Sequence, residues 1–206
     1  GLCGLGGGTI TRSCASGNIT AGANSSRLGG LAGTTNRYSK ITFCYATGNI
    51  EAGAGSCIMG GFCGNFGSLA GLVAPADDLP PGDPYIANCF ATGDIGQCAS
   101  QAGGFTGNAL SHTLTNCYSS GSVAAERDAY CIGGFVGDIY ACTVSNSYSM
   151  GRVSGGEYPG GFCGWNNTAE GGAVVNCFWN IQTSGMGSSD GGSGRSTAQM
   201  QRVSTF

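Results

Sequence analysis

The sequence is poor in charged residues, and this scarcity excludes several classes of protein. Charged residues make up 9% of the 206 residues, the formal net charge is −3, and Lys40 and His112 are the only lysine and the only histidine. Nucleic-acid binding depends on a dense row of cations that neutralises phosphates, so we expect no nucleic-acid partner. No apolar run approaches the roughly 20 residues of a membrane-spanning helix, so we expect no membrane span.

Paired metal-ligand motifs are also missing. The chain has no C-x-x-C pair and a single histidine beside its 12 cysteines, whereas structural zinc sites combine such pairs with histidines. We therefore expect neither a metal nor a cofactor. Twelve cysteines in a chain of this length favour an oxidising compartment, and they predict disulfides or buried thiols in a secreted or cell-surface protein.

Glycine is abundant. The chain contains 41 glycines, while its apolar fraction of 41% is ordinary. The combination of low hydrophobicity and high charge that is typical of disorder is absent. Glycine reaches positive φ without steric cost, but it destabilises a helix by roughly 1 kcal/mol. The composition therefore predicts an ordered fold with many tight turns and little helix.

A short phrase recurs along the chain. "NCFATGDI" at 88–95 is repeated in similar form as "FCYATGNI" at 43–50, "NCYSSGSV" at 116–123 and "NSYSMGRV" at 146–153. A second phrase of the type "GGFVG" precedes each copy. A column of like residues with a period near 30 residues is typical of a stacked solenoid. Each copy is anchored by a small residue before the aromatic one: Ser13, Cys44, Cys89, Cys117, Ser147 and Cys177.

The apolar residues of each copy lie in about three short runs rich in β-branched and aromatic residues, which favours strands and a three-sided coil. We predict an all-β, single-domain parallel β-solenoid, a right-handed β-helix of about six coils of ~30 residues. Residues 1–181 form the coils, with a proline-rich loop insertion at 65–84, and residues 182–206 form an extended Gly/Ser-rich tail. Two aromatic columns are expected to stack as ladders in the core: Tyr45, Phe90, Tyr118, Tyr148 and Phe178, and Phe62, Phe105, Phe135 and Phe162.

The paired phrases "GGFVG" at 133–137 and "NCFATG" at 88–93 resemble the GLUG motif, a repeat of large bacterial surface and secreted proteins. The closing segment "NCFWNIQTSGMGSSDGGSGRSTAQMQ" at 176–201 is similar to the way such arrays end. The resemblance covers the chain apart from the insertion, and it implies an extracellular, adhesin-like β-solenoid. It carries over no catalytic residues. The extra cysteines and the proline-rich insertion depart from the usual pattern.

The cysteines have two interpretations. In the anchor column cysteine alternates with serine, which favours a small, buried packing position. Thiol catalysis needs an activating base, and His112 has no recognisable partner motif, so we expect no catalytic residue and no enzyme. Cysteines outside the anchor column are disulfide candidates that would tie coils together, each bridge contributing about 2–4 kcal/mol: Cys3, Cys57, Cys63, Cys98, Cys131, Cys142 and Cys163.

The carboxylates form no repeated column. Asp94 shares its column with asparagine, serine and arginine, and the alignment leaves its role unexplained. Asp77, Asp78 and Asp83 cluster in the insertion, where a solvated turn is a simpler interpretation than a calcium site. Glu157 is interpreted as surface charge. Three N-x-S/T sequons provide acceptors for N-glycosylation in a suitable host: Asn18, Asn24 and Asn166.

Function is expected to follow from the repeat. The leading hypothesis is a non-enzymatic extracellular structural protein, a disulfide-braced solenoid that serves as a surface-fibre subunit or an adhesive stalk. Open coil ends and the polar tail favour head-to-tail self-association by strand addition, and cell-surface glycans are the other expected partner. The alternative is a carbohydrate-binding or carbohydrate-cleaving module of a larger exoprotein, which predicts a groove with clustered acids and exposed aromatic rings. A passive spacer within a longer exoprotein is a third interpretation.

Overall fold

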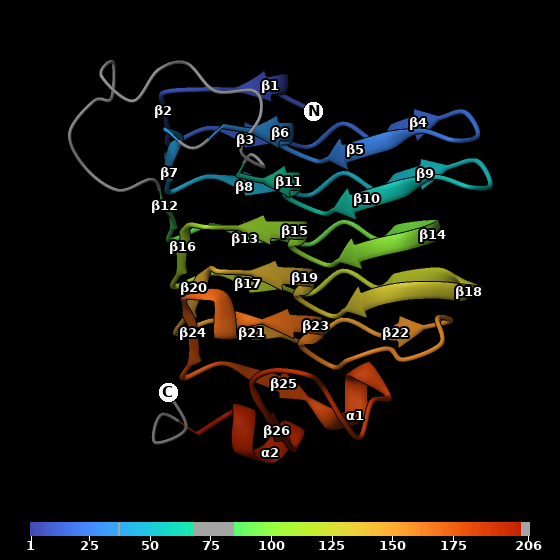
Figure 1. Cartoon of the computed structure of the whole chain (residues 1–206), viewed down its shortest axis with the longest axis vertical. Helices are drawn as coiled ribbons and strands as arrows, with labels where there is room; N and C mark the ends of the chain where they lie inside the picture. Colours follow the sequence, from blue (N-terminus) through green and yellow to red (C-terminus); the bar gives the residue numbers. More distant parts are fainter. Residues whose placement is uncertain (37, 68–84, 203–206) are drawn as a thin grey trace.

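Successive repeats stack directly on one another along a single axis (Figure 1). The computed structural model describes residues 1–36, 38–67 and 85–202, and it is 53% strand and 6% helix. The aligned residues Ile10, Ile41 and Ile86 lie in register on three neighbouring parallel strands. The predicted all-β, parallel β-solenoid is therefore confirmed.

In the described part of the chain, four sheets run along the axis. Sheet A contains β1 (Cys3–Gly6), β6 (Ala32–Thr35), β11 (Cys63–Phe66), β15 (Thr106–Leu110), β19 (Val136–Tyr140) and β23 (Cys163–Asn167). Sheet B contains β2 (Thr9–Thr11), β7 (Lys40–Thr42), β12 (Tyr85–Ala87), β16 (Thr113–Thr115), β20 (Thr143–Ser145) and β24 (Ala173–Val175). Sheet C contains β3 (Cys14–Ala15), β8 (Tyr45–Ala46), β13 (Phe90–Ala91), β17 (Tyr118–Ser119), β21 (Tyr148–Ser149), β25 (Phe178–Asn180) and β26 (Ser193–Arg195). Sheet D contains β4 (Ile19–Ala21), β5 (Ser26–Gly29), β9 (Ile50–Ala52), β10 (Cys57–Gly60), β14 (Ile95–Gly103), β18 (Val123–Gly133) and β22 (Val153–Ser154).

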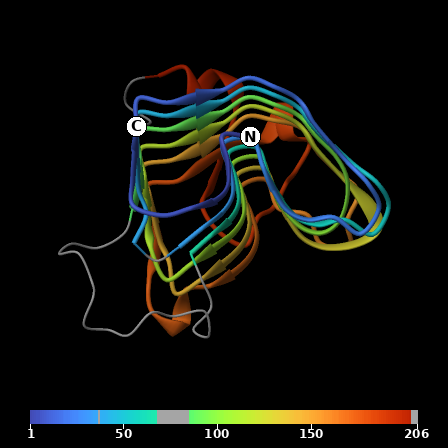
Figure 2. The ribbon, with the colours of Figure 1, turned by 90° about the horizontal axis from the view of Figure 1, so that it is seen from above.

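Seen from above, the coil has two lobes rather than the three sides that the sequence predicts (Figure 2). Sheets A, B and C surround the main core, which is centred on the phenylalanines of the "GGF" phrase. Sheet D forms the second lobe around a smaller core that includes Ile50, Met59 and Ile95. This second lobe is not evident from the sequence, because the strands of sheet D carry polar residues such as those at 126–128. Such residues are typical of an exposed corner.

One hydrogen-bond pattern explains why cysteine and serine alternate in the anchor column. The Cys89 thiol donates to the carbonyl two residues earlier (3.2 Å) and accepts the Cys44 N–H of the preceding coil (3.4 Å). The Ser147 hydroxyl makes the same two contacts, to the carbonyl two residues earlier (2.8 Å) and from the Cys117 N–H (3.1 Å). From Cys44 onward the column is buried, as predicted, and its side chains also hydrogen-bond to the backbone.

Asp94, whose role the alignment leaves unexplained, belongs to a second column of this kind. The side-chain oxygen of Asn18 accepts the Asn49 N–H (2.9 Å), and that of Asn49 accepts the Asp94 N–H (2.9 Å). Asp94 in turn accepts the Ser122 N–H (2.7 Å). Asn18, Asn49 and Asp94 thus each supply an acceptor to the next coil, so Asp94 has a structural role.

The inner aromatic ladder is confirmed. Phe62, Phe105, Phe135 and Phe162 are fully buried and stack with ring centroids 4.7, 4.9 and 4.8 Å apart. These distances match the spacing of neighbouring strands, about 4.8 Å, because each coil contributes one ring directly above the next.

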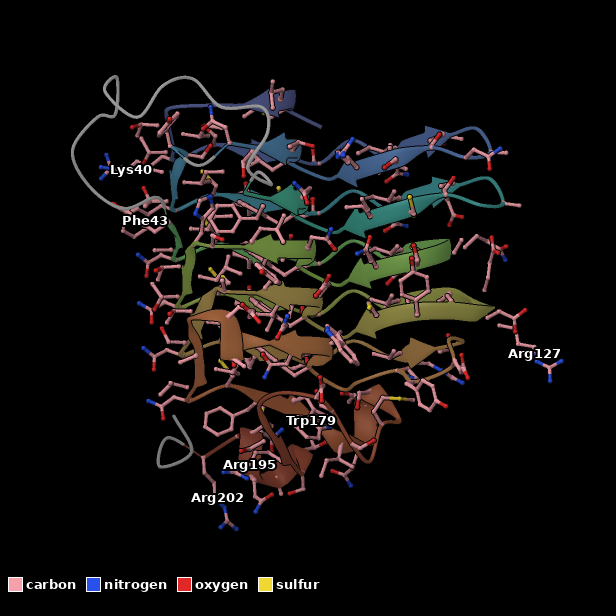
Figure 3. All side chains as sticks on the ribbon, viewed as in Figure 1. Lys40, Phe43, Arg127, Trp179, Arg195 and Arg202 are labelled. Atoms are coloured by element: carbon pink, nitrogen blue, oxygen red, sulfur yellow. The ribbon has the colours of Figure 1, made fainter. Side chains whose placement is uncertain are left out.

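The second aromatic column stacks as expected, with centroids 5.0 to 5.2 Å apart, but its predicted place in the core is wrong. Tyr45 is 38% exposed, and Phe90, Tyr118 and Tyr148 are partly exposed. Side chains alternate along a strand, so an inward-pointing anchor residue turns the next residue outward. Of this column only Phe178 is buried; the guanidinium of Arg195 lies 5.0 Å from its ring centre. Phe43 projects at the corner beside the column (Figure 3).

The C-terminal segment, expected as an extended tail, folds over the last coil as a cap (Figure 1). The cap contains α1 (Ile181–Ser184), β26 and α2 (Thr197–Met200), and β26 pairs in parallel with β25 of the same chain. The Trp179 indole N–H donates to the Met186 carbonyl (3.1 Å), and the Ser189 hydroxyl accepts the N–H groups of Phe162 and Cys163 (3.1 and 2.8 Å). The C-terminal segment thus adds a strand to sheet C of its own chain. A short 3-10 helix, η2 (Thr168–Glu170), follows β23.

The predicted disulfides are not formed, and all twelve cysteines are free thiols. The register explains this result, because the candidates do not face one another across neighbouring strands. Cys57 pairs with Ser26 and Ser100, and Cys163 pairs with Val136. The same holds for Cys63, which lies between Ala32 and Thr106.

The structure describes the three sequons but not the acidic cluster of the insertion. Asp77, Asp78 and Asp83 lie outside the described residues. Asn18 and Asn24 are exposed, whereas Asn166 is half-buried and its amide nitrogen donates to the Asp190 carbonyl (3.2 Å). No helix in the described ranges is long and apolar enough to cross a membrane.

Candidate functional site: the cleft between sheets A and D

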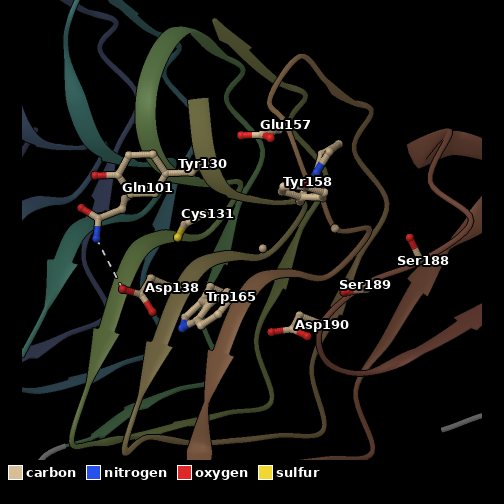
Figure 4. A pocket seen from close by; sticks show the side chains of 13 residues that line it. Gln101, Tyr130, Cys131, Asp138, Glu157, Tyr158, Trp165, Ser188, Ser189 and Asp190 are labelled. Atoms are coloured by element: carbon tan, nitrogen blue, oxygen red, sulfur yellow. Dashed lines mark hydrogen bonds between the residues drawn. The ribbon is translucent and has the colours of Figure 1, made fainter. Parts of the chain in front are cut away.

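The molecule is hollowed where sheets A and D meet near the C-terminal coils (Figure 4). The hollow, here called the A–D cleft, measures about 860 Å³. Gln101 and Cys131 line it from β14 and β18, while Asp138 and Trp165 line it from the neighbouring strands β19 and β23. Asp138 and Trp165 are in register. Tyr130 and Gly164 also line the cleft, and the loop after β22 and the cap complete the lining with Glu157, Tyr158, Pro159, Gly160, Ser188, Ser189 and Asp190.

The last glycine of the "GGFVG" phrase brings the two sheets together. A Cβ atom on Gly137 would lie 2.5 Å from the Gly107 carbonyl oxygen and 2.6 Å from that of Cys131. The two backbones therefore approach each other without an intervening side chain, which only glycine permits. The next residue along each strand of sheet A is then positioned beside the junction, where Asp138 and Trp165 lie.

Three aromatic side chains surround the cleft and remain largely in water. Tyr130 is 57% exposed, Tyr158 is 77% exposed and Trp165 is 57% exposed. A single exposed apolar side chain is normal on a protein surface, but several around one cleft are typical of a binding site. Such rings offer flat apolar faces together with a polar group for hydrogen bonding.

Three carboxylates share the same cleft: Asp138, Glu157 and Asp190. The Gln101 amide donates to Asp138 Oδ2 at 3.4 Å, and the Asn166 N–H donates to Asp190 Oδ2 at 2.7 Å. Burial raises the pKa of Asp138, and the hydrogen bond from Gln101 opposes that rise. The cleft therefore presents hydrogen-bond acceptors in fixed positions.

The thiol in the cleft is not an activated nucleophile. Burial, followed by the nearby charges of Asp138 and Asp190, raises the pKa of Cys131 to about 11. A nucleophilic cysteine requires a lowered pKa, because the thiolate is the reactive form. His112 does not line the cleft, and burial lowers its pKa.

The sequence identifies few of these residues. Of the predicted site residues only Cys131 lines the cleft, and Asn166 borders it through Asp190. The remaining disulfide candidates are dispersed over sheets A and D, apart from Cys142, which lies between β19 and β20. Glu157, interpreted as surface charge, contributes to the cleft wall. One feature of the sequence could have indicated Trp165 as a site residue. In its column, this bulky aromatic residue takes the place that polar residues hold in other coils: Thr34, Asn65, Asn108 and Asp138.

Comparison with known proteins assigns no family to the chain. The chain matches no family model, no curated protein and no solved structure. Within residues 1–36, 38–67 and 85–202, no group of three or more His, Cys, Asp or Glu side chains is placed to hold a metal ion.

Proposed function

We propose that the protein is an extracellular, adhesin-type β-solenoid that binds a neutral glycan in the A–D cleft. The observation that carries the proposal is the gathering of three exposed aromatic rings and three carboxylates around one hollow of about 860 Å³. That volume is within the range of small-ligand sites, roughly 300–1,000 Å³. The extracellular location rests on the resemblance to the GLUG motif.

The chemistry of the lining favours a sugar. A pyranose ring has two apolar faces of C–H groups and a rim of hydroxyls, so it can stack on Trp165 or Tyr158 while it donates hydrogen bonds to Asp138 or Glu157. No lysine or arginine is among the described residues that line the cleft. An acidic sugar would therefore be repelled by the carboxylates, and a neutral one is preferred.

Binding is proposed rather than cleavage. Glycoside hydrolysis uses two carboxyl groups that flank the scissile bond, one as an acid and one as a base or nucleophile. Asp138 and Asp190 instead lie on either side of the Trp165 indole, and each is held by a hydrogen bond from the protein (Figure 4). This arrangement suits a sugar that rests on the indole between two acceptors.

The solenoid would serve as a rigid stalk for this site. The fibre version of the hypothesis loses support, because head-to-tail stacking at the C-terminal end would require the cap to leave the last coil. That step would break the pairing of β26 with β25 and the hydrogen bonds to the Ser189 hydroxyl.

Tryptophan fluorescence offers a direct test. Of the two tryptophans, Trp165 is 57% exposed in the cleft and Trp179 is 6% exposed beneath the cap. Titration with neutral oligosaccharides from an array should change the emission saturably. Replacing Trp165 by alanine should weaken binding, measured by calorimetry, at least ~10-fold.

Phe43→Ala is the matched control, because Phe43 is 59% exposed but does not line the cleft. Its affinity should equal that of the wild type. The proposal fails if no neutral glycan binds, or if the Phe43 and Trp165 variants lose affinity equally.

A further inference from the structure

A second groove runs along the outer corner between sheets B and C. It measures about 600 Å³ and is here called the corner groove. One wall consists of asparagines and the other of the outer aromatic ladder. It shares no lining residue with the A–D cleft. Its lining comes from three consecutive coils: Asn116, Cys117, Tyr118, Asn146, Tyr148, Asn176 and Phe178.

Backbone conformation alone does not account for the asparagines. The asparagine before each of the last four anchors has positive φ, a conformation that asparagine tolerates well. The corresponding positions of the first two coils are Arg12 and Phe43, and they hold the same conformation with φ of 48° and 54°. The corner therefore does not require an amide, and a run of four amides is found: Asn88, Asn116, Asn146 and Asn176.

These amides form pairs and retain hydrogen-bonding capacity. Asn116 Nδ2 donates to Asn88 Oδ1, and Asn176 Nδ2 donates to Asn146 Oδ1, both at 3.3 Å. The amide nitrogens of Asn88 and Asn146 donate to no protein atom in the described part of the chain, and both side chains are exposed. Donors thus remain available along the edge of the groove, beside the tyrosine rings.

The spacing of polar groups along the groove restricts the kinds of ligand that can match it. Polar groups recur once per coil, about every 4.8 Å, whereas an extended peptide repeats a face about every 6.6–6.8 Å. No lysine or arginine is among the described residues that line the groove, which disfavours a polyanion. A 1,4-linked pyranose ring is about as long as one coil is high, and its hydroxyls accept hydrogen bonds from amides.

We infer that the corner groove binds a linear, neutral, 1,4-linked glycan that lies parallel to the solenoid axis with about one sugar per coil. The glycan would hydrogen-bond to Asn116 and Asn146 and pack against the edges of Tyr118 and Tyr148. This site goes beyond the A–D cleft, and its existence does not depend on that cleft.

The test uses the Trp165→Ala variant, in which the A–D cleft is disabled. Cellohexaose is the 1,4-linked probe, and isomaltohexaose, which is 1,6-linked, is the control of different geometry. Calorimetry should show that Trp165→Ala binds cellohexaose at least ~10-fold more tightly than isomaltohexaose. Adding Asn116→Gly and Asn146→Gly should weaken cellohexaose binding at least ~10-fold, because glycine keeps the positive φ but removes the amide.

Two further variants separate binding from folding. Asn146→Asp keeps an oxygen at this position but removes the donor, so it should also weaken binding. Asn24→Gly, at another exposed position of positive φ, should leave binding unchanged. The inference is overturned if the amide variants bind cellohexaose as tightly as their parent, or if both hexasaccharides bind equally.

The two proposals fail in different ways. If Trp165→Ala removes all glycan binding, the corner groove is refuted and the A–D cleft is supported. If the amide variants remove all binding and Trp165→Ala removes none, the A–D cleft is refuted and the corner groove is supported. Absence of any glycan binding by the wild-type protein refutes both.

Discussion

Replacing Cys89 by alanine tests the hydrogen-bonding role of the anchor column. Alanine removes the thiol that donates to the Ala87 carbonyl and accepts the Cys44 N–H. Cys44 is 1% exposed and Ala87 is 6% exposed, so water does not readily replace the lost partner. An unsatisfied buried group costs about 1–3 kcal/mol, and the lost burial of the sulfur adds about 1 kcal/mol. We expect Cys89→Ala to lower the free energy of unfolding by about 2–4 kcal/mol.

Serine at the same position separates hydrogen bonding from packing. The Ser147 hydroxyl already makes both contacts in this column, at 2.8 and 3.1 Å. Cys89→Ser should therefore retain the two hydrogen bonds and lose only part of the packing, at a cost of about 1 kcal/mol or less. Ser147→Cys is the reciprocal control and should be close to neutral.

Urea unfolding followed by far-UV circular dichroism, in reducing buffer, measures these differences. The midpoints should shift while the slope m stays constant, because the surface exposed on unfolding is the same. If Cys89→Ser is as destabilising as Cys89→Ala, the hydrogen bonds contribute nothing, and the column is a packing position alone.

Three further outcomes are expected. Protein denatured without reductant should take up a thiol label at all twelve cysteines, as measured by mass spectrometry; a smaller number would indicate disulfides. Burial raises the pKa of Asp138 above its ordinary value of 3.8, so the stability contributed by its protonated form is present below that pH and is lost as the pH rises through the raised pKa. Asp138→Asn should remove this loss in thermal melts from about pH 3 to about pH 7, and an unchanged pH profile would contradict the assignment. A Cβ on Gly134 would lie 2.2 Å from the Gly161 carbonyl oxygen, so Gly134→Ala should prevent folding or cost at least ~3 kcal/mol. Gly187→Ala, with no atom within 4 Å of the new Cβ, is the control and should melt like the wild type.

The sequence by itself determined the stacking of the coils. A column of β-branched and aliphatic residues at a constant interval can be buried only if each coil lies on the next, and Ile10, Ile41 and Ile86 do so in register. The outward direction of Tyr118 was also available from the sequence, because it directly follows the buried Cys117. The abundance of glycine predicted tight turns, whereas Gly137 serves mainly to bring two sheets together.

Only the tertiary structure decided where the A–D cleft lies. Glu157, Trp165 and Asp190 come from a loop, a strand and the cap, and no periodic pattern links such positions. The fold of the cap depends on contacts made after the coils are stacked, such as those of Ser189 with the N–H groups of Phe162 and Cys163. Repetition in a sequence specifies what every coil shares, whereas the A–D cleft forms where coils differ, and those differences meet only after the chain has folded.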